Sequence, residues 1–386
     1  MRENKSPDHF TLEVALTGLA AVLGFKFAFA DFDLAGHLQH EWQMLVNLFG
    51  LLMGFEILAK HFEESRVPEA LPRILPGEWK GGFVLLCLVG VLSCFLDNIA
   101  AAMIGGTIAH VVFKGRVHIG YLAAIVAASN AGGAGSVVGD TTTTMMWIDG
   151  VSPLAVLHAF VGAAVAIVCS GLVAARQQDR LQRIQKDTSG AAKIVWRRIG
   201  VVALILAGAI ATNVALDFPA VGVWVAILLC AMFTKTPWSG LRVAWRGSLF
   251  LVSLVFCASL MPVEQLPAAS WQTAFGLGFV SAVFDNIPLT KLALDQGGYD
   301  WGFLAFTVGY GGSMIWFGSS AGVALSNIFP QAKSVGAWLK HGWHVAAAYV
   351  LAVVVMLLTI GWHPQPPHKP PQAGPPTPTA PATPPR

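Results

Sequence analysis

A polar, glycine-rich stretch interrupts the long apolar segments in the first half of the chain. It reads Ser129-Asn130-Ala131-Gly132-Gly133-Ala134-Gly135-Ser136-Val137-Val138-Gly139-Asp140, and four threonines follow it, Thr141 to Thr144. Irregular backbone survives in hydrocarbon only when it is buried in protein or lines a wet cavity, because unpaired amides are costly there. A carboxylate such as Asp140 is also costly at that depth and indicates a functional site. The stretch therefore predicts a cation site made of carbonyl, hydroxyl, amide and carboxylate oxygens.

A second copy of the pattern lies near the other end of the chain. Each copy has two glycines, five further residues, and then a glycine with a polar residue: Gly132-Gly133 and Gly139-Asp140, Gly311-Gly312 and Gly318-Ser319. An Asp-Asn pair precedes each copy, at Asp97-Asn98 and at Asp285-Asn286. Interrupted apolar segments at corresponding places in two halves point to the binding site of a transporter.

The composition indicates a membrane protein. Of the 386 residues, 55% are hydrophobic and only 12% are charged, whereas soluble domains carry roughly 25% charged residues. The net charge of +3 is small and dispersed, so nucleic acid is not an expected partner. We expect a multi-pass, all-α protein whose partners are the lipid bilayer and small ions.

The chain divides into five expected parts. These are a polar N-terminus (1–10), a first transmembrane half (11–175), a basic linker (176–198), a second transmembrane half (199–362) and a Pro-rich disordered tail (363–386). A connector as rich in Lys and Arg as the linker is typical of the cytoplasmic side. The first apolar segment ends in a small-x-small sequence, Ala28-Phe29-Ala30, but charged residues interrupt it, so we expect a retained helix rather than a cleaved signal.

Individual helices can be placed from the apolar runs. Asp31 to His40 is expected to be a polar loop before a spanning helix at Trp42 to Lys60. The apolar run that follows Asp97-Asn98, up to His110, is too short for comfortable spanning, which favours a re-entrant hairpin or a broken helix. Pro288 removes a backbone donor, so it is expected to kink or end the helix beside Asp285. Pro153 to Ala175 is expected to be one clean spanning helix, with His158 packed and hydrogen-bonded inside it.

Five motifs together resemble the NhaD-type sodium/proton antiporters. They are Phe95-Leu96-Asp97-Asn98-Ile99, Asn130-Ala131-Gly132-Gly133, Gly139-Asp140-Thr141-Thr142-Thr143-Thr144-Met145-Met146-Trp147, Phe284-Asp285-Asn286-Ile287-Pro288 and Gly318-Ser319-Ser320-Ala321-Gly322-Val323-Ala324. That family belongs to the ion-transporter superfamily, with the arsenite and citrate/dicarboxylate carriers. The resemblance runs from about Trp42 to about Ile360. It implies two inverted repeats, each with a re-entrant hairpin and a broken transmembrane helix, in the inner (cytoplasmic) membrane of the cell.

The motifs also supply the candidate site residues. Those expected to bind the ion or substrate are Asp97, Asn98, Ser129, Asn130, Gly132, Gly133, Asp140, Thr141, Thr142, Asp285, Asn286, Gly311, Gly312, Ser319 and Ser320. The expected Na⁺ ligands among them are Asp97, Asn130, Asp140, Thr141 and Asp285. Proton coupling is assigned to Asp140, Asp285 and Glu56. We expect no resident cofactor, only the transported Na⁺ or Li⁺ and H⁺.

Two charged residues have alternative interpretations. Glu56 is either an interfacial residue near Lys60 or a proton-carrying carboxylate that faces the bundle, as the resemblance implies. Lys291 departs from the family pattern and either neutralises Asp285 or pairs with Asp295 at i+4.

The first functional hypothesis is Na⁺(Li⁺)/H⁺ antiport. A carboxylate in a partly dry site binds a proton more readily, so proton and cation compete for it, and rocking of the two halves exposes the site alternately. The alternative is a Na⁺- or H⁺-coupled carrier of an anion such as citrate, a dicarboxylate or arsenite. It would use Ser129-Asn130, Ser319-Ser320, half-helix N-termini and Lys291. An enzyme is not expected, since the sequence has no nucleophile-base pair or metal-ligand cluster. The sequence does not decide the oligomeric state, and a homodimer is one possible assembly.

Overall fold

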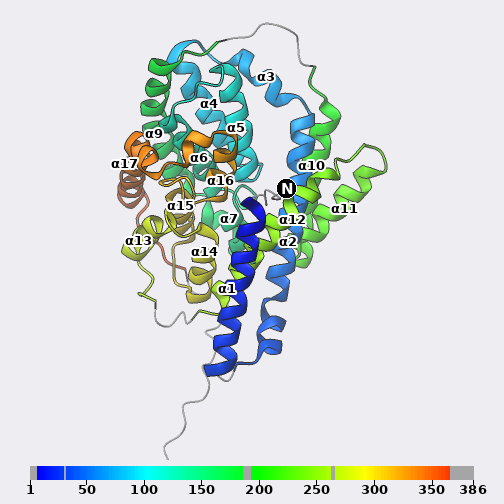
Figure 1. Cartoon of the computed structure of the whole chain (residues 1–386). Helices are drawn as coiled ribbons and strands as arrows, with labels where there is room; N and C mark the ends of the chain where they lie inside the picture. The colour runs from blue at the N-terminus through cyan, green and yellow to red at the C-terminus, as the bar shows by residue number, and fades with distance from the viewer. Residues whose placement is uncertain (1–6, 30–31, 186–192, 262–265, 366–386) are drawn as a thin grey trace, which may run out of the picture.

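The structure is a computed structural model that describes residues 7–29, 32–185, 193–261 and 266–365. Within these ranges the chain forms helices joined by turns and loops, and no strand (Figure 1). The prediction of an all-helical protein is confirmed. The basic linker is described only outside residues 186–192, and most of the Pro-rich tail, residues 366–386, lies outside the described residues.

The first half of the chain forms nine α-helices within the described residues. They are α1 (Pro7–Phe29), α2 (Leu34–Glu64), α3 (Val67–Ile74), α4 (Glu78–Ser93), α5 (Asn98–Val112), α6 (Ile119–Ala134), α7 (Thr141–Ile148), α8 (Pro153–Val156) and α9 (Ala159–Leu181). Those of the second half are α10 (Trp196–Leu216), α11 (Pro219–Ala231), α12 (Ser239–Ser259), α13 (Trp271–Ser281), α14 (Asn286–Gln296), α15 (Trp301–Gly311), α16 (Ser320–Ile328), the 3₁₀ turn η2 (Pro330–Lys333) and α17 (Val335–Thr359).

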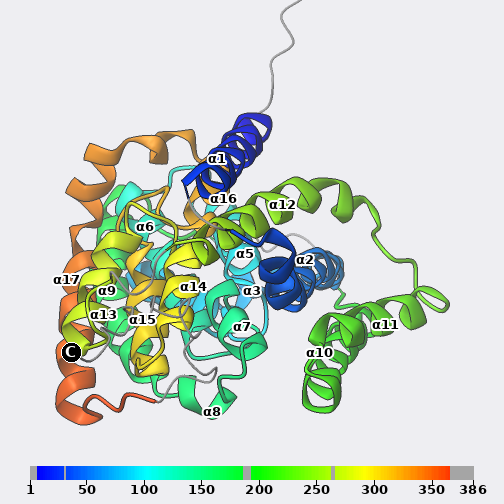
Figure 2. The same cartoon turned by 90° about the horizontal axis from the view of Figure 1, so that it is seen from below.

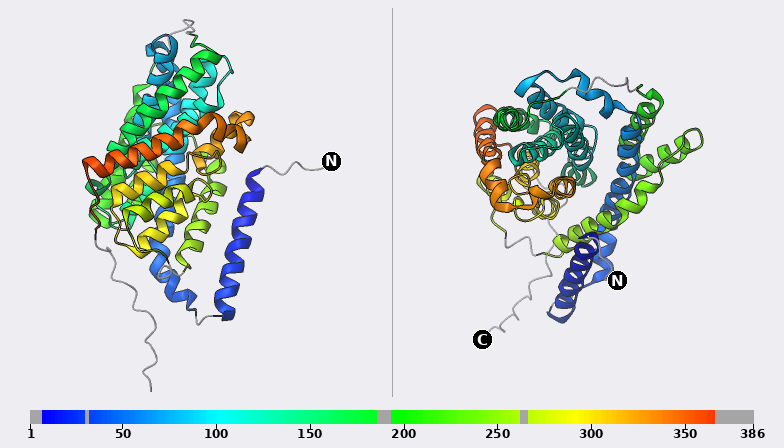
Figure 3. Two further views of the ribbon diagram at one scale, coloured as in Figure 1. Left: turned by 90° about the vertical axis from the view of Figure 1, so that its left-hand side faces the viewer. Right: turned by 45° about the horizontal axis from the view of Figure 1, so that its top comes forward.

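The helices form two groups in space. We call α1, α2, α10, α11 and α12 the side layer, and α4–α9 with α13–α17 the main bundle; α3 runs between them (Figures 2 and 3). The two groups meet where α12 packs on α14 and where α2 packs on α7 and α5. Within the main bundle the sequence halves interleave, because α6 packs on α15 and α9 packs on α17. The two sequence halves are therefore not separate bodies.

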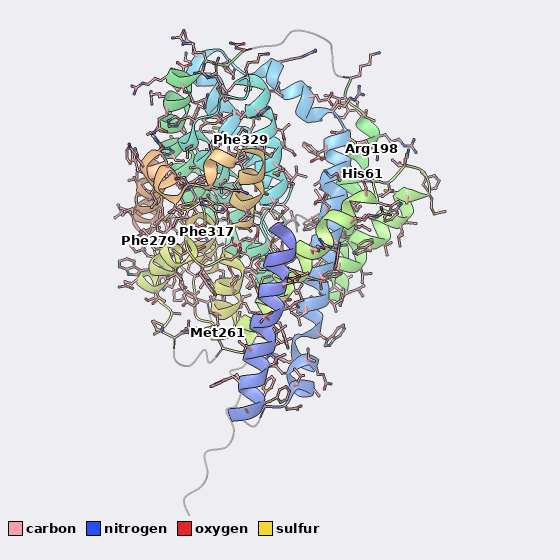
Figure 4. All side chains as sticks on the ribbon, in the orientation of Figure 1. His61, Arg198, Met261, Phe279, Phe317 and Phe329 are labelled. Atoms are coloured by element: carbon pink, nitrogen blue, oxygen red, sulfur yellow. The ribbon has the colours of Figure 1, made fainter. Side chains whose placement is uncertain are left out.

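One end of the side layer is held together by an arginine. Arg198, at the start of α10, donates from Nη1 to His61 Nδ1 at 2.7 Å and to the backbone carbonyl of Lys235 at 2.6 Å. It also pairs with Glu64 at the end of α2. Figure 4 labels His61 and Arg198 where these helices meet. These bonds join α2, α10 and the α11–α12 loop into one unit.

Several helices have the length and apolarity of membrane spans. In the part of the chain that the structure describes, four helical segments qualify: Leu34–Glu64, Pro153–Leu181, Trp196–Leu216 and Val335–Thr359. Shorter apolar helices of 10–17 residues, among them Asn98–Val112 and Ile119–Ala134, are below the ~20 residues that cross ~30 Å of hydrocarbon. Apolar side chains on the side layer are exposed, such as Val214 at 81% and Met232 at 75%. A surface of this kind is suited to lipid, and the protein is a multi-pass membrane protein.

Four helices begin at the predicted interruptions, each capped by a side chain of the predicted motifs. Asp97 accepts from the amide of Ile99, Asp140 from Thr142, Asp285 from Ile287 and Ser319 from Gly322, at 2.9–3.4 Å. A side-chain oxygen at this position satisfies an amide that the first turn leaves unpaired. The sequence motifs therefore mark helix starts in the middle of the bundle.

Three local predictions are wrong. Residues 34–40 belong to α2 rather than to a loop, because Asp33 caps the helix through the amide of Ala35 and α2 starts early. The expected clean helix from Pro153 is interrupted at Leu157-His158 between α8 and α9. Pro288 does not end a helix but lies in the first turn of α14, where a missing amide costs little.

Candidate functional site

The two glycine-rich stretches are held by equivalent hydrogen bonds. Ser93, the last residue of α4, donates from Oγ to the carbonyl of Ser129 at 2.6 Å. Ser281, the last residue of α13, donates to the carbonyl of Val308 at 2.7 Å. Both bonds join a helix that ends before an Asp-Asn pair to the helix that leads into a glycine-rich break. The internal similarity read from the sequence therefore extends to these contacts.

The predicted site glycines lie where backbones approach closely. A Cβ added to any of the four would collide with the backbone of another glycine: Gly132 with Gly90, Gly133 with Gly139, Gly311 with Gly278 and Gly312 with Gly318. Gly132 lets α4 approach α6, and Gly311 lets α13 approach α15. A part for them in ion binding stays a prediction.

A buried hydrogen-bonded network joins the two halves at the breaks. Asn98 Nδ2 donates to Asn130 Oδ1 at 3.0 Å and to Asp140 Oδ1 at 3.1 Å. Asn130 Nδ2 in turn donates to Ser313 Oγ at 2.9 Å, just beyond the end of α15. All four residues are at most 4% exposed. The structure thus brings three predicted site residues of the first half against a serine of the second half.

Asp140 has one carboxylate oxygen without a hydrogen bond. Its Oδ1 accepts from Asn98 and from the Thr142 amide, whereas Oδ2 is buried and has no partner. The hydroxyl Oγ1 of Thr142 is likewise buried and makes no hydrogen bond of good geometry. Asp97 and Asp285 both lie within electrostatic reach of Asp140. A buried charge in this setting is costly unless a proton or a cation neutralises it.

The threonines after Asp140 do not all face the site. Thr143 Oγ1 donates to the carbonyls of Ser136 and Asp140 at 2.6 and 2.9 Å. Thr144 Oγ1 donates to the carbonyls of Val137 and Asp140, both at 2.9 Å. Two of the four hydroxyls, those of Thr143 and Thr144, therefore satisfy carbonyls of the break, and a part for any of the four in binding a cation stays a prediction. Thr141 and Thr142 remain as candidate ligands, and both are buried.

The second copy has a different set of side chains. Asn286 corresponds to Asn98, but its Nδ2 is buried without a hydrogen-bond partner. The positions that match Asn130 and Asp140 are occupied by Gly309 and Ser319. Ser319 uses its hydroxyl to cap α16, and Ser320 next to it is half-buried. The carboxylate of the second copy is Asp285, which is half-buried at the start of α14.

Ser129 lies inside α6 beside this network. Its hydroxyl donates to the carbonyl of Val126 at 2.9 Å, within the same helix. The residue is fully buried. Its backbone carbonyl accepts from Ser93, and a part for Ser129 in ion binding stays a prediction.

Glu56 lies in the side layer, half-buried on α2. Its side chain is packed against the backbone of Gly240 on α12. It lies within electrostatic reach of Asp97 across the interface and of Lys60 on its own helix. Both interpretations of Glu56 remain compatible with this place, and its proton-carrying role stays a prediction.

Lys291 is fully buried and pairs away from the site. Its ammonium forms an ion pair with Asp295 one turn further along α14 and another, at 3.2 Å, with Glu41 of α2. Glu41 is 3% exposed, and the side chain of Asp295 is 25% exposed. The alternative in which Lys291 pairs with Asp295 is therefore the one seen. The partner that sequence reasoning missed, Glu41, lies 250 residues away and gives no local signal.

His158 is hydrogen-bonded, as expected. Its Nε2 lies 2.6 Å from Oδ1 of the buried Asp300, which caps α15 through the amide of Phe303. The other oxygen of Asp300 accepts from the amide of His363. This pair fixes the start of α15 against α8–α9 and the end of α17.

Ser313 was also missed by sequence reasoning. It follows Gly311-Gly312 directly, as Ala134 follows Gly132-Gly133. A polar residue at this position, where the first copy has alanine, was the sequence signal that could have indicated Ser313.

The chain is similar over most of its length to known sodium/proton antiporters. Sodium/proton antiporter 1 of Arabidopsis thaliana is 26% identical over 406 residues, which cover 91% of this chain and 68% of that protein. Na⁺/H⁺ antiporter NhaD of Halomonas elongata is 26% identical and covers 77% of this chain and 72% of its own length. NhaD of Vibrio cholerae is 24% identical, with 83% and 80% covered. No protein-family profile matches the chain. The resemblance to the NhaD-type sodium/proton antiporters that the motifs predict is therefore confirmed.

Proposed function

We propose that this protein exchanges Na⁺ or Li⁺ for H⁺ across a membrane, with proton and cation competing for Asp140. The observation that carries the proposal is the free oxygen Oδ2 of this buried carboxylate, in a network that both halves build. Its similarity to antiporters named for sodium and protons supports the same exchange. All of the relatives named above are transporters rather than enzymes.

The cation is held mainly from the first half. Asp140 Oδ2 and Thr142 Oγ1 are the two buried oxygens that lack hydrogen-bond partners and are the first ligands we propose. The further proposed ligands are Asp97, Asn130, Thr141 and Asp285. Asp97 and Asp285 add negative charge near Asp140. This charge strengthens the attraction of the site for a positive ion when Asp140 is ionised.

Alternating access requires two bodies that move against each other. Because the sequence halves interleave inside the main bundle, we propose that the main bundle moves against the side layer rather than one half against the other. The interface of α12 with α14 and of α2 with α7 is the surface that would shift. The site lies in the main bundle and would move with it.

The finer fold and location follow the same proposal. The two halves are inverted repeats, and the α4–α5 and α13–α14 pairs are re-entrant hairpins. The protein lies in the inner (cytoplasmic) membrane, where a homodimer is compatible with the exposed apolar face of the side layer.

An anion carrier is not favoured. Its basic candidate, Lys291, is neutralised by two carboxylates and turned to the side layer. The relatives named above are cation antiporters.

Flux measurements in proteoliposomes test the proposal. Purified protein is reconstituted, and H⁺ movement is recorded after addition of Na⁺, Li⁺, K⁺ or citrate. We expect exchange with Na⁺ and Li⁺, and loss of that exchange in Asp140→Asn and in Asp285→Asn. Exchange that survives both substitutions, or uptake driven by citrate alone, contradicts the proposal.

A further inference from the structure

The two unpartnered oxygens of the site converge on the bare backbone of one glycine. A Cβ placed on Gly309, in α15, would lie 3.1 Å from Asp140 Oδ2 and 3.9 Å from Thr142 Oγ1. Its next neighbour would be the Cβ of Ala134 at 3.8 Å. Asp140 and Thr142 come from the first half and Gly309 from the second, so this point lies where the halves meet.

The internal repeat makes the absence of a side chain at Gly309 informative. The matching residue of the first half is Asn130, whose amide bonds Asn98 and Ser313. Gly309 is helical and its φ is not positive, so backbone strain does not require a glycine here. The close-packing glycines described above face another backbone, whereas Gly309 faces a carboxylate and a hydroxyl.

We propose that Gly309 determines which cation the site accepts, by keeping the space beside Asp140 Oδ2 and Thr142 Oγ1 free of side-chain atoms. This inference rests on the proposed cation exchange. Hard cations bind oxygen at about 2.0–2.6 Å, so a small monovalent ion fits against these two oxygens where a methyl carbon is already too close.

The direct test is Gly309→Ala, compared with Gly276→Ala. Gly276 lies in α13, and a Cβ there meets nothing within 4 Å, so it controls for the same substitution in a helix. We expect Gly309→Ala to raise the KM for Na⁺ about tenfold, the scale set by overpacking of one methyl group, and the KM for the smaller Li⁺ by less. The Li⁺/Na⁺ selectivity ratio therefore changes, which a general folding defect would not cause. Gly276→Ala is expected to keep the wild-type ratio.

A second variant covers the case in which Gly309→Ala does not fold. Thr142→Val replaces a buried hydroxyl that makes no hydrogen bond of good geometry with a methyl group of similar size. We expect it to reach the membrane in wild-type amounts and to lower exchange of Na⁺ more than that of Li⁺.

The outcomes separate this inference from the proposed function. A wild-type protein that exchanges neither Na⁺ nor Li⁺ overturns both. Wild-type exchange together with an unchanged Li⁺/Na⁺ ratio in folded Gly309→Ala overturns the part assigned to Gly309 alone. If only Thr142→Val can be made, wild-type exchange with an unchanged Li⁺/Na⁺ ratio in that variant overturns the part assigned to Gly309.

Discussion

At the scale of single residues, the four threonines after Asp140 have two different tasks. Thr143 and Thr144 turn back and satisfy the carbonyls of the break, and Asp140 itself supplies one of those carbonyls. Thr142 holds its hydroxyl beside the carboxylate, without a hydrogen bond of good geometry. The break is stable in the bundle because its backbone groups find side-chain partners, as irregular backbone at this depth requires.

This division predicts opposite results for neighbouring substitutions. Thr143→Val removes the donor to the carbonyls of Ser136 and Asp140, and an unmade buried hydrogen bond costs about 1–3 kcal/mol. We expect a lower thermal unfolding temperature of the purified protein for Thr143→Val and no loss for Thr142→Val. Equal destabilisation by the two substitutions would show that the hydroxyl of Thr142 is bonded after all.

The candidate site was predictable from the sequence where residues repeat and not where contacts cross the fold. Asp97, Asp140 and Asp285 were recognised because each sits at an interruption of an apolar run. Gly309 could not be recognised, because its proposed role depends on its contact with Asp140, which lies in the other half of the sequence. The tasks of the threonines were also hidden, because all four have the same side chain.

At the scale of helices, α14 carries both a site residue and a contact to the side layer. Asp285 caps its start, and Lys291, less than two turns later, pairs with Glu41 of α2 and with Asp295 of α14. Lys291 therefore keeps a partner on its own helix if α14 moves away from α2. Glu41 has no such second partner among the ion pairs of the structure described here.

Removal of either charge should have unequal effects. Lys291→Met leaves Glu41 buried without its cation, which typically costs about 3–5 kcal/mol for a broken buried pair. Glu41→Gln leaves Lys291 with Asp295 and is expected to cost clearly less. Thermal unfolding of the two purified variants measures the difference. The double substitution of Glu41 and Lys291 by Met is expected to recover most of the stability that Lys291→Met loses. Equal losses in the two single variants would rule out this asymmetry.

Helix positions were predictable from apolar runs, but helix ends were not. The starts of α5, α7 and α14 follow from Asp-Asn and Gly-Asp motifs, because a carboxylate caps the first turn. The early start of α2 was missed, since its first turns are polar and only the cap at Asp33 marks it. The interruption between α8 and α9 was missed because the contact of His158 with Asp300 lies 142 residues away.

At the scale of the whole molecule, the proposed exchange has the main bundle move against the side layer. A cross-link between position 41 on α2 and position 291 on α14 tests this movement. The five native cysteines are replaced first, and Glu41→Cys with Lys291→Cys are joined by a reducible bifunctional reagent. We expect exchange to stop on cross-linking and to return on reduction.

Two controls make the cross-link informative. Each single-cysteine variant treated with the same reagent should keep its exchange. A pair within the side layer, Asn47→Cys with Ala220→Cys, joins segments that are already bonded through the Ala220 amide and should be tolerated when linked. Undiminished exchange in the variant cross-linked between positions 41 and 291 would mean that the main bundle and the side layer stay together throughout the transport cycle.

The central claim is that Na⁺ and H⁺ compete for one carboxylate, and proton release on Na⁺ binding measures it most directly. Na⁺ is added to purified protein in weakly buffered solution over a range of pH, and the released protons are counted. We predict release by the wild type and by Gly276→Ala, and none by Asp140→Asn. Binding of Na⁺ without proton release in the wild type, or release that persists in Asp140→Asn, would contradict the account.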